Sequence, residues 1–238
     1  MHAVLMAGGK GTRLHPYTVT TPKVLLPING VPIIQSLIEQ LRDEGIREFT
    51  VVVNHLADVI ERKLGTGRRL GVEIDYYREE VPLDTAGCLG QFTPSRHPFL
   101  LINADVVTDL SFLSLASHHQ ATGALATIGL ARHEVNVDFG VVESDAIGRL
   151  TGYVEKPSIE LWVSMGIYCL NPRVRHFVEP GESISMPQLL TRLHLSGERV
   201  DCYRTNCNWR DIGRPEDYQQ AVRPTLKLSG HALSRRAA

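Results

Sequence analysis

The sequence predicts an α/β fold with a mostly parallel sheet covered by helices on both faces. Patterns of short buried strands alternate with amphipathic helical patterns through most of the 238 residues, and this alternation is typical of βαβ units. Hydrophobic residues make up 43% of the chain and charged residues 21%, an ordinary globular composition that can bury a substantial core. We expect a single domain over residues 1–238, with a loosely ordered tail from about residue 224.

The N-terminal third contains the clearest elements. The segments HAVLMA (2–7) and FTVVVN (49–54) are apolar and predict two buried strands. Between them, residues 31–45 predict a helix that ends at Gly45 and carries one apolar face, formed by Ile33, Ile34, Leu37, Ile38 and Leu41. Residues 56–65 predict a second amphipathic helix that ends at a glycine.

The rest of the chain continues the alternation. VEIDYY (72–77) alternates like a strand, and HPFLLINAD (97–105) predicts a buried strand that ends on an acid. We expect a helix over residues 111–121 with Asp109 as its cap, and a helix over 185–197 capped by Ser185. Further strands are predicted at 124–131, 140–144, 148–156 and 161–170, and a last helix at 214–222.

Charge and cysteine content exclude several classes of function. The formal net charge is −1, so the chain lacks the basic footprint of a protein that binds nucleic acid or an anionic membrane. The four cysteines form no CxxC pair, which argues against a zinc site and a disulfide framework. We see no signal peptide and no transmembrane run. These features predict a cytoplasmic protein without a nucleic-acid or membrane partner.

The stretch LMAGGKGTRLHPYTVTTPKVLLPI carries the first functional signal. A strand followed by glycines and a helix start exposes backbone N–H groups, which suits phosphate binding. It is not a Walker A loop, and the dinucleotide pattern fails because Leu14 stands at the third glycine position. Arg13 can bind phosphate oxygens in a bidentate manner, and Lys23 adds a point charge. The competing interpretation is a tight turn with two solvated cations.

This stretch resembles the signature of the sugar nucleotidyltransferases, also called nucleotide-sugar pyrophosphorylases. Later segments resemble the same family in its order, namely PLDTAGCL, LLINADVV, FGVVESDAIGRLTGYVEKP, MGIYCLNP and WRDIGRPEDY. The resemblance runs from about residue 1 to residue 222. It implies a Rossmann-like three-layer α/β/α domain with a mostly parallel mixed sheet and no C-terminal β-helix.

The resemblance also implies an activity. The family transfers a nucleoside monophosphate from a nucleoside triphosphate to a sugar 1-phosphate and releases pyrophosphate with the help of Mg²⁺. Carried over by motif, the catalytic residues are Arg13, Lys23 and Asp105, and the metal ligands are Asp105 and Asp211. The nucleotide-binding residues are Ala7, Gly8, Gly9, Gly11, Thr12, Arg13, Lys23, Glu80, Thr85, Ala86 and Gly87. The residues expected at the sugar phosphate are Asn103, Gly140, Glu155, Lys156, Ser164 and Gly166.

Two positions depart from the family pattern. Ser164 stands where asparagine is usual, and a hydroxyl makes fewer hydrogen bonds than an amide. By the resemblance, residues 78–87 (REEVPLDTAG) form the loop that contacts the base, here called the base loop. Asp84 stands where this loop usually has glycine, and it adds a charge and restricts the backbone. The acceptor is therefore open: a hexose or heptose 1-phosphate is expected, and a phosphorylated acceptor that is not a sugar is the alternative. A regulatory subunit that senses nucleotide sugars is the alternative outside enzymes, and a homo-oligomer is possible.

The base loop suggests GTP as the nucleotide. Glu79, Glu80 and Asp84 lie near the expected position of the base edge, and a carboxylate can accept both N–H donors of guanine. Uracil and thymine have a single N–H donor between two carbonyl oxygens, and these oxygens would repel a carboxylate. The Thr-Ala-Gly form of the loop also resembles mannose 1-phosphate and heptose 1-phosphate guanylyltransferases. UTP, dTTP, CTP and ATP remain open, because backbone groups could read the base instead.

Overall fold

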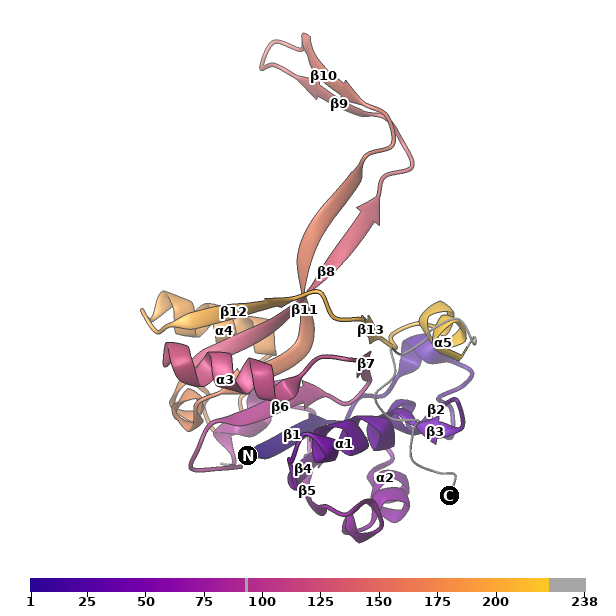
Figure 1. Ribbon diagram of the computed structural model, residues 1–238, viewed down its shortest axis with the longest axis vertical. Helices are drawn as coiled ribbons and strands as arrows, with labels where there is room; N and C mark the ends of the chain where they lie inside the picture. Colours follow the sequence, from indigo (N-terminus) through magenta and orange to yellow (C-terminus); the bar gives the residue numbers. More distant parts are fainter. Residues whose placement is uncertain (93, 223–238) are drawn as a thin grey trace, which may run out of the picture.

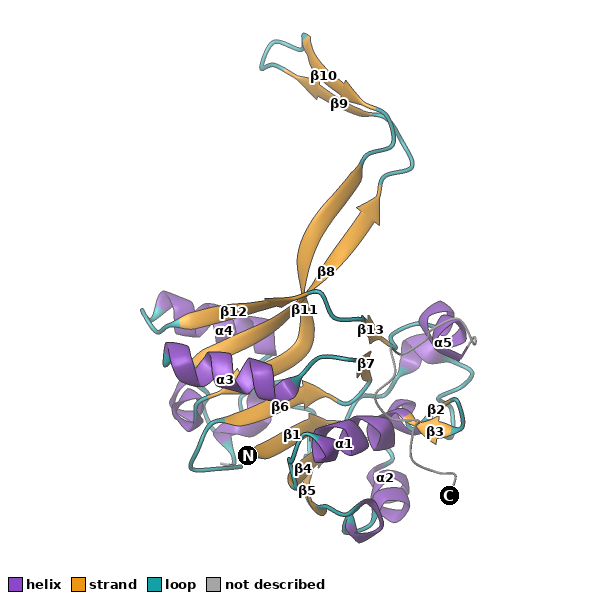
Figure 2. Ribbon diagram, viewed as in Figure 1, coloured by secondary structure: helices purple, strands orange, loops and turns teal. Residues whose placement is uncertain are grey.

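A seven-stranded mixed sheet forms the centre of the molecule (Figures 1 and 2). The computed structural model describes residues 1–92 and 94–222. The strands lie in the order β12-β8-β11-β6-β1-β4-β5. Within this sheet β11 runs antiparallel to β6 and β8, and the other neighbours are parallel. The bounds are β1 His2–Met6, β4 Glu48–Val53, β5 Glu73–Arg78, β6 Phe99–Asn103, β8 Ala126–Asn136, β11 Ser158–Leu170 and β12 Val200–Thr205. The predicted mostly parallel sheet is confirmed.

Helices cover both faces of the sheet, which gives the predicted three layers. On one face, α1 (Ile33–Asp43), α2 (Ala57–Leu64) and α3 (Phe112–Thr122) share a core cluster with Leu5 of β1. On the other face, α4 (Met186–Leu195) and the 3₁₀ segments η4 (Gly87–Gly90) and η5 (Pro172–Phe177) pack with Val4. Neighbouring residues of β1 thus enter opposite cores, because strand side chains alternate between faces.

The helix boundaries follow the predicted periodicity and caps. All five apolar residues predicted for α1 are buried, and Gly45 has a φ of 89° just beyond the helix end. Ser185 caps α4 in a capping box with Gln188. The cap predicted for α3 was wrong: Ser111 accepts the hydrogen bond from Ser114 N, whereas Asp109 accepts from the backbone N and side-chain Nδ2 of Asn208.

The glycine turn after β1 does not lead into an α-helix as the sequence suggested. The chain forms two 3₁₀ turns, η1 (Thr12–Leu14) and η2 (Lys23–Leu25), and a short hairpin of β2 (Pro27–Ile28) and β3 (Val31–Pro32) before α1 begins. Prolines 16, 22, 27 and 32 punctuate this segment, and each removes a backbone N–H donor that a longer helix needs. A helix dipole is therefore not available to the turn.

Two short strands join distant parts of the chain. β7 (Val106–Thr108) pairs antiparallel with β13 (Trp209–Asp211) at the edge of the body. The C-terminal helix α5 (Pro215–Val222) follows β13, and a small cluster of Leu14, Leu26, Ile33, Ile212 and Ala221 holds it against the opening segment. The predicted tail after residue 224 lies outside the described residues.

A long β arm projects from the body (Figures 1 and 2). Beyond Ala131 and Val163, strands β8 and β11 leave the sheet as a two-stranded ribbon that ends in the hairpin of β9 (Val141–Ser144) and β10 (Leu150–Val154). We call residues 132–163 the arm. In the part of the chain that the structure describes, no helix is long and apolar enough to cross a membrane.

Candidate active site

The site residues gather at the carboxyl ends of β1 and β6. From β1 the sheet continues to β4 and β5 on one side and to β6 on the other, so the crossover direction changes between β1 and β6. In open α/β sheets, ligands bind outside the strand ends at such a switch point. The glycine turn follows β1, and Asp105 follows β6.

The glycine turn leaves backbone exposed at this edge. Ala7 N donates to Val52 O over 2.8 Å, which fixes the start of the turn. Gly11 takes a φ of 63°, and Thr18 Oγ1 donates to its carbonyl over 2.7 Å. A Cβ placed on Gly9 would meet no atom within 4 Å. The middle of the turn is therefore open to a ligand, and Thr12 and Arg13 beside it are exposed.

Lys23, Asp105 and Asp211 form the charged centre of the site. The ammonium of Lys23 is hydrogen-bonded to Asp105 Oδ2 and lies 3.7 Å from Asp211 Oδ1. The β7–β13 ladder sets this geometry: Asp211 lies opposite Val106, and Ile212 N donates to the Asp105 carbonyl over 3.1 Å. Lys23 is buried, so the interpretation of a solvated lysine does not hold for it.

Burial and the neighbouring charges shift the pKa of one acid of this centre, Asp211. Burial raises the pKa of Asp211, and the charge of Asp105 acts in the same direction; Lys23 and Arg13 partly oppose both effects. The charge of exposed Arg13 thus reaches the acid pair. Asp105 Oδ1 is buried and has no hydrogen-bond partner among the described residues. A buried carboxylate oxygen without a partner is costly, so this atom is available to a cation.

The acid pair fits Mg²⁺. Mg²⁺ prefers oxygen ligands and is usually bound through one or two carboxylates together with substrate phosphates. Asp105 supplies an unpartnered oxygen, and Asp211 supplies a second carboxylate beside it. Among the described residues, no group of three or more His, Cys, Asp or Glu side chains could hold a metal ion. The remaining ligands would therefore come from substrate and water.

Three of the residues predicted for the sugar phosphate lie beside this centre. Asn103 ends β6, and a Cβ on Gly166 would come within 2.5 Å of its Nδ2. Gly166, with a φ of 70°, thus lets Asn103 approach the β11 backbone. Ser164 Oγ lies 3.2 Å from Tyr168 OH, at a register shift of β11. Trp209 Nε1 donates to Met165 O over 2.9 Å, which ties β13 to the same strand.

Among the acids of the base loop, Glu79 lies against the glycine turn. A Cβ on Gly8 would lie 3.7 Å from Glu79 Oε2, and Asn54 Nδ2 holds the Glu79 carbonyl over 2.7 Å. Glu79 Oε1 is buried without a hydrogen-bond partner among the described residues, and burial raises the pKa of this carboxyl. Glu80, the acid listed among the predicted nucleotide-binding residues, is exposed. The sequence placed Glu79 near the base edge as well, and its position directly beyond β5 is the signal that could have preferred it to Glu80.

Asp84 is engaged within the loop. Its φ of 63° lies in the left-handed region that favours glycine, which explains why glycine suits this position. Asp84 Oδ1 accepts the Thr85 N–H over 2.7 Å, and such a local bond makes this conformation tolerable for aspartate.

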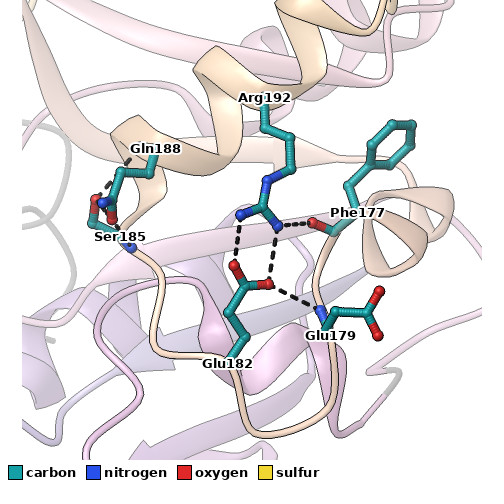
Figure 3. A network of polar contacts seen from close by, with 6 residues as sticks. All are labelled: Phe177, Glu179, Glu182, Ser185, Gln188 and Arg192. Atoms are coloured by element: carbon teal, nitrogen blue, oxygen red, sulfur yellow. Dashed lines mark hydrogen bonds and ion pairs between the residues drawn. The ribbon is translucent and has the colours of Figure 1, made fainter.

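The base loop is braced by the segment before α4, whose own polar contacts are shown in Figure 3. Ala86 N donates to Ile184 O over 3.0 Å, and Met186 N donates to Thr85 Oγ1 over 2.8 Å. A Cβ on Gly87 would lie 2.3 Å from Glu182 O. Arg192 of α4 holds Glu182 through two hydrogen bonds and also donates to Phe177 O. The predicted nucleotide residues Thr85, Ala86 and Gly87 are therefore packed, and only a rigid loop surface is left for a base.

The other three residues predicted for the sugar phosphate lie on the arm. Tyr153 OH donates to Glu155 Oε2 over 3.1 Å, and a Cβ on Gly140 would clash with both side chains. Lys156 has a φ of 46° and follows directly. Figure 1 shows this part of the arm far from the turn after β1. Within one chain, the structure does not bring Gly140, Glu155 and Lys156 to Asp105.

Comparison with known proteins identifies the family. The model of the nucleotidyl transferase family matches residues 2–227. The chain belongs to the nucleotidyl transferase family. Among curated relatives of this nucleotidyl transferase, a UTP–glucose-1-phosphate uridylyltransferase of Synechocystis sp. is 33% identical over 95% of this chain and 63% of the relative. The mannose-1-phosphate guanylyltransferase catalytic subunit beta of Drosophila melanogaster is 32% identical over 91% and 60%. The chain spans about three-fifths of the length of these relatives.

Solved structures share the fold. HddC from Yersinia pseudotuberculosis complexed with GMP-PN superposes with a TM-score of 0.69 at 24% identity, covering 93% of this nucleotidyl transferase and 97% of HddC. A putative glucose-1-phosphate thymidylyltransferase from Bacillus anthracis, in complex with a sucrose, gives 0.74 at 21% identity over 93% and 94%. At these identities the likeness concerns the fold.

Proposed function

We propose that this nucleotidyl transferase moves a nucleoside monophosphate from a nucleoside triphosphate, preferably GTP, to a sugar 1-phosphate. The observation that carries the proposal is the cluster of Lys23, Asp105 and Asp211 beside the open glycine turn. It combines exposed backbone, a fixed ammonium and a carboxylate pair at one edge of the sheet. Transfer between phosphates needs these groups, because its catalysis consists mainly of positioning and charge neutralisation.

The reaction is an in-line displacement. An oxygen of the sugar 1-phosphate attacks the α-phosphorus, the bond from that phosphorus to the β-phosphate oxygen breaks, and pyrophosphate leaves with the electron pair. Asp105 and Asp211 would hold Mg²⁺, which would neutralise phosphate charge when bound. Arg13 and the turn N–H groups bind the departing phosphates, and the Lys23 ammonium moves from Asp105 towards the phosphate oxygens as they arrive.

Glu79 is the proposed reader of guanine. Its Oε1 is buried without a partner among the described residues, and its Oε2 lies against the glycine turn, so the N1–H and amino donors of guanine would satisfy the carboxylate. The similarity to mannose-1-phosphate guanylyltransferases supports this choice. The similarity to a uridylyltransferase supports UTP as the second candidate. A hexose or heptose 1-phosphate is the proposed acceptor, and a cytoplasmic location suits both substrates.

A release assay tests the nucleotide and the acceptor together. Pyrophosphate release is measured with GTP, UTP, dTTP, CTP and ATP against a panel of sugar 1-phosphates, with phosphocholine as a non-sugar acceptor. We expect GTP to lead. Glu79→Gln should lower kcat/KM for GTP by about 10- to 100-fold, since bonds to a carboxylate contribute roughly 1.5–3 kcal/mol each, and should leave UTP nearly unchanged.

Glu80→Gln is the matched control, because Glu80 is exposed. The Glu80→Gln protein should retain the preference of the wild type for GTP. A tenfold preference of the wild-type protein for UTP or dTTP over GTP would contradict the role of Glu79. The absence of pyrophosphate release with every pair would contradict the transferase itself and favour a sensor of nucleotide sugars.

A further inference from the structure

The arm carries an apolar stripe that none of the other described residues of the chain covers. In the ribbon, Ile159 pairs with Val135, and Leu161 lies two residues further on β11. These side chains share one face, because alternate residues of a strand point the same way. All three are exposed, at 39–47%. Of the eighteen large hydrophobic residues exposed in the described part of the chain, eleven lie within residues 132–163.

The stripe continues the core of the body. Ala131 and Met165, at the base of the ribbon, belong to the larger core cluster, and Val163 links them to Leu161 along β11. The opposite face of the ribbon is polar and occupied. Arg132 forms an ion pair with Glu160, Ser158 is hydrogen-bonded to Glu134, and Arg204 lies 5.5 Å from the centre of the Trp162 ring.

A ribbon of this kind needs a partner. A two-stranded hairpin is marginally stable by itself in water, and a contiguous exposed apolar face marks an interaction surface. The pairing of β8 with β11 is continuous from Ser158 to Ser164, so the ribbon does not bend back on itself in this stretch, and Figure 1 shows it projecting away from the body. The described residues of the same chain therefore do not supply the cover, and a second copy brings a matching stripe.

Within one chain, the candidate active site lacks Glu155 and Lys156, the predicted sugar-phosphate residues that lie on the arm. Lys156 lies seven residues beyond Val163, which corresponds to about 23 Å at roughly 3.3 Å per strand residue. That distance is much longer than a lysine side chain, so Lys156 cannot reach the Asp105 centre of its own chain along this ribbon. Two such arms packed antiparallel across a two-fold axis would place the outer end of each beside the base of the other. The base of the ribbon adjoins Ser164, at the edge where the site lies.

We propose that two copies of this chain exchange their arms, so that Glu155 and Lys156 of one copy complete the sugar-phosphate side of the other copy's site. The apolar stripes of the two ribbons pack against each other. The cation of Lys156 then faces the place where two phosphate-bearing substrates meet. The proposed pairing of two arms is inferred from the apolar stripe and the shape of the ribbon alone, whereas the sharing of the site rests on the proposed function.

The pairing is tested by mass in solution. We expect the wild-type protein to be a dimer by light scattering. Ile159→Asn with Leu161→Asn should give a monomer, whereas Glu134→Asn with Glu160→Asn, on the polar face of the same ribbon, should stay dimeric. Circular dichroism checks that both variants keep the folded body. A wild-type monomer, or equal dimerisation of the two double variants, would overturn the pairing whether or not the protein is an active transferase.

The sharing is tested by complementation. Asp105→Asn and Lys156→Ala, each expected to have little activity alone, are co-expressed with different tags, and the activity of the random mixture of dimers is measured. A hybrid holds one whole site, so a random mixture should recover about a quarter of the wild-type activity per chain. Asp105→Asn with Asp211→Asn, two changes in the same body, should recover none. A dimer without recovery in the first mixture would overturn the sharing, and pyrophosphate release by the wild type separates this result from failure of the proposed function.

Discussion

At the scale of single residues, the acid pair carries the sharpest expectation. Asp105→Asn and Asp211→Asn keep the shape of the side chains but remove one charge each from the centre around Lys23. Each should lower kcat on the order of 100-fold and raise the Mg²⁺ concentration for half-maximal activity, because amides are weaker ligands.

Steady-state rates measured over a Mg²⁺ series, with a chelator as the zero point, check this expectation. Asp109→Asn is the matched control, because Asp109 follows β7 but binds Asn208. It should keep the wild-type Mg²⁺ dependence. Activity in excess chelator, or an unchanged Mg²⁺ series in both site variants, would contradict the metal role.

Gly9 separates ligand binding from folding. An added Cβ would meet no atom of the protein within 4 Å, so Gly9→Ala should leave the melting temperature nearly unchanged. The same methyl group would stand where the turn must approach triphosphate, so KM for the nucleotide should rise. Gly87→Ala is the contrast, because its Cβ would lie 2.3 Å from Glu182 O and should lower the melting temperature. A Gly9→Ala protein with wild-type KM would show that the triphosphate binds elsewhere.

The residues of the centre were predictable in type but not in arrangement. Arg13 and Lys23 stand out beside the glycines, and Asp105 ends an apolar strand, so sequence patterns select them. Asp211 lies more than a hundred positions away, and the β7–β13 ladder that brings it to Asp105 is only three residues long. So short a strand leaves no periodic signal, and the pairing had to be seen in the fold.

At the scale of elements, the bracing of the base loop by α4 links stability to binding. Arg192 holds Glu182, whose carbonyl lies under Gly87. Arg192→Met should lower the melting temperature and raise KM for the nucleotide. Arg199→Met removes a similar bidentate pair with Asp201 away from the loop, so it should affect stability alone. Equal KM values in the two variants would contradict the bracing.

The same contact makes a pH prediction. The hydrogen bonds from Arg192, with a smaller contribution from the Glu179 N–H, lower the pKa of Glu182 to about 2, below its unfolded value near 4.5. A carboxyl whose pKa is depressed in the folded state adds stability that is complete above the unfolded pKa and is lost as pH falls towards the folded one. The stability gap between wild type and Arg192→Met should therefore be constant near pH 7 and shrink from about pH 4.5 downwards. Urea titrations across this range measure it, and a gap that widens in acid would be contrary to this assignment.

Helices and strands with strong hydrophobic periodicity were predictable from the sequence. Elements that form only through contacts with other parts of the fold were not. The apolar stripe of α1 and the capping box of α4 fix those helices locally. Strand β12, with the sequence VDCYRT, was missed because it lies at the sheet edge and has little apolar alternation. The helix expected after the glycine turn was wrong because prolines interrupt the segment before α1.

At the scale of the whole molecule, sequence predicts the layers and the two strands of the outer hairpin, β9 and β10, but it does not predict that the arm projects from the body. Strands were expected at 124–131 and 161–170, close to the parts of β8 and β11 that lie in the body. The structure extends both strands outwards until Asn136 pairs with Ser158. Apolar and polar residues alternate along this extension as they do in any half-buried strand. The sequence therefore does not show whether the apolar stripe faces the core, the solvent or a second copy.

Exchange of arms makes the wild-type activity depend on its partner. In a hybrid of wild type with Asp105→Asn, the wild-type body still receives an intact arm. In a hybrid with the double variant Asp105→Asn/Lys156→Ala, it receives an arm without the lysine, and the other body has lost its metal ligand. Wild type co-expressed with a large excess of the single variant should therefore retain its activity per wild-type chain, whereas excess of the double variant should abolish it. Equal activities in the two mixtures would mean that each chain completes its own site, because the two partners differ only at residue 156.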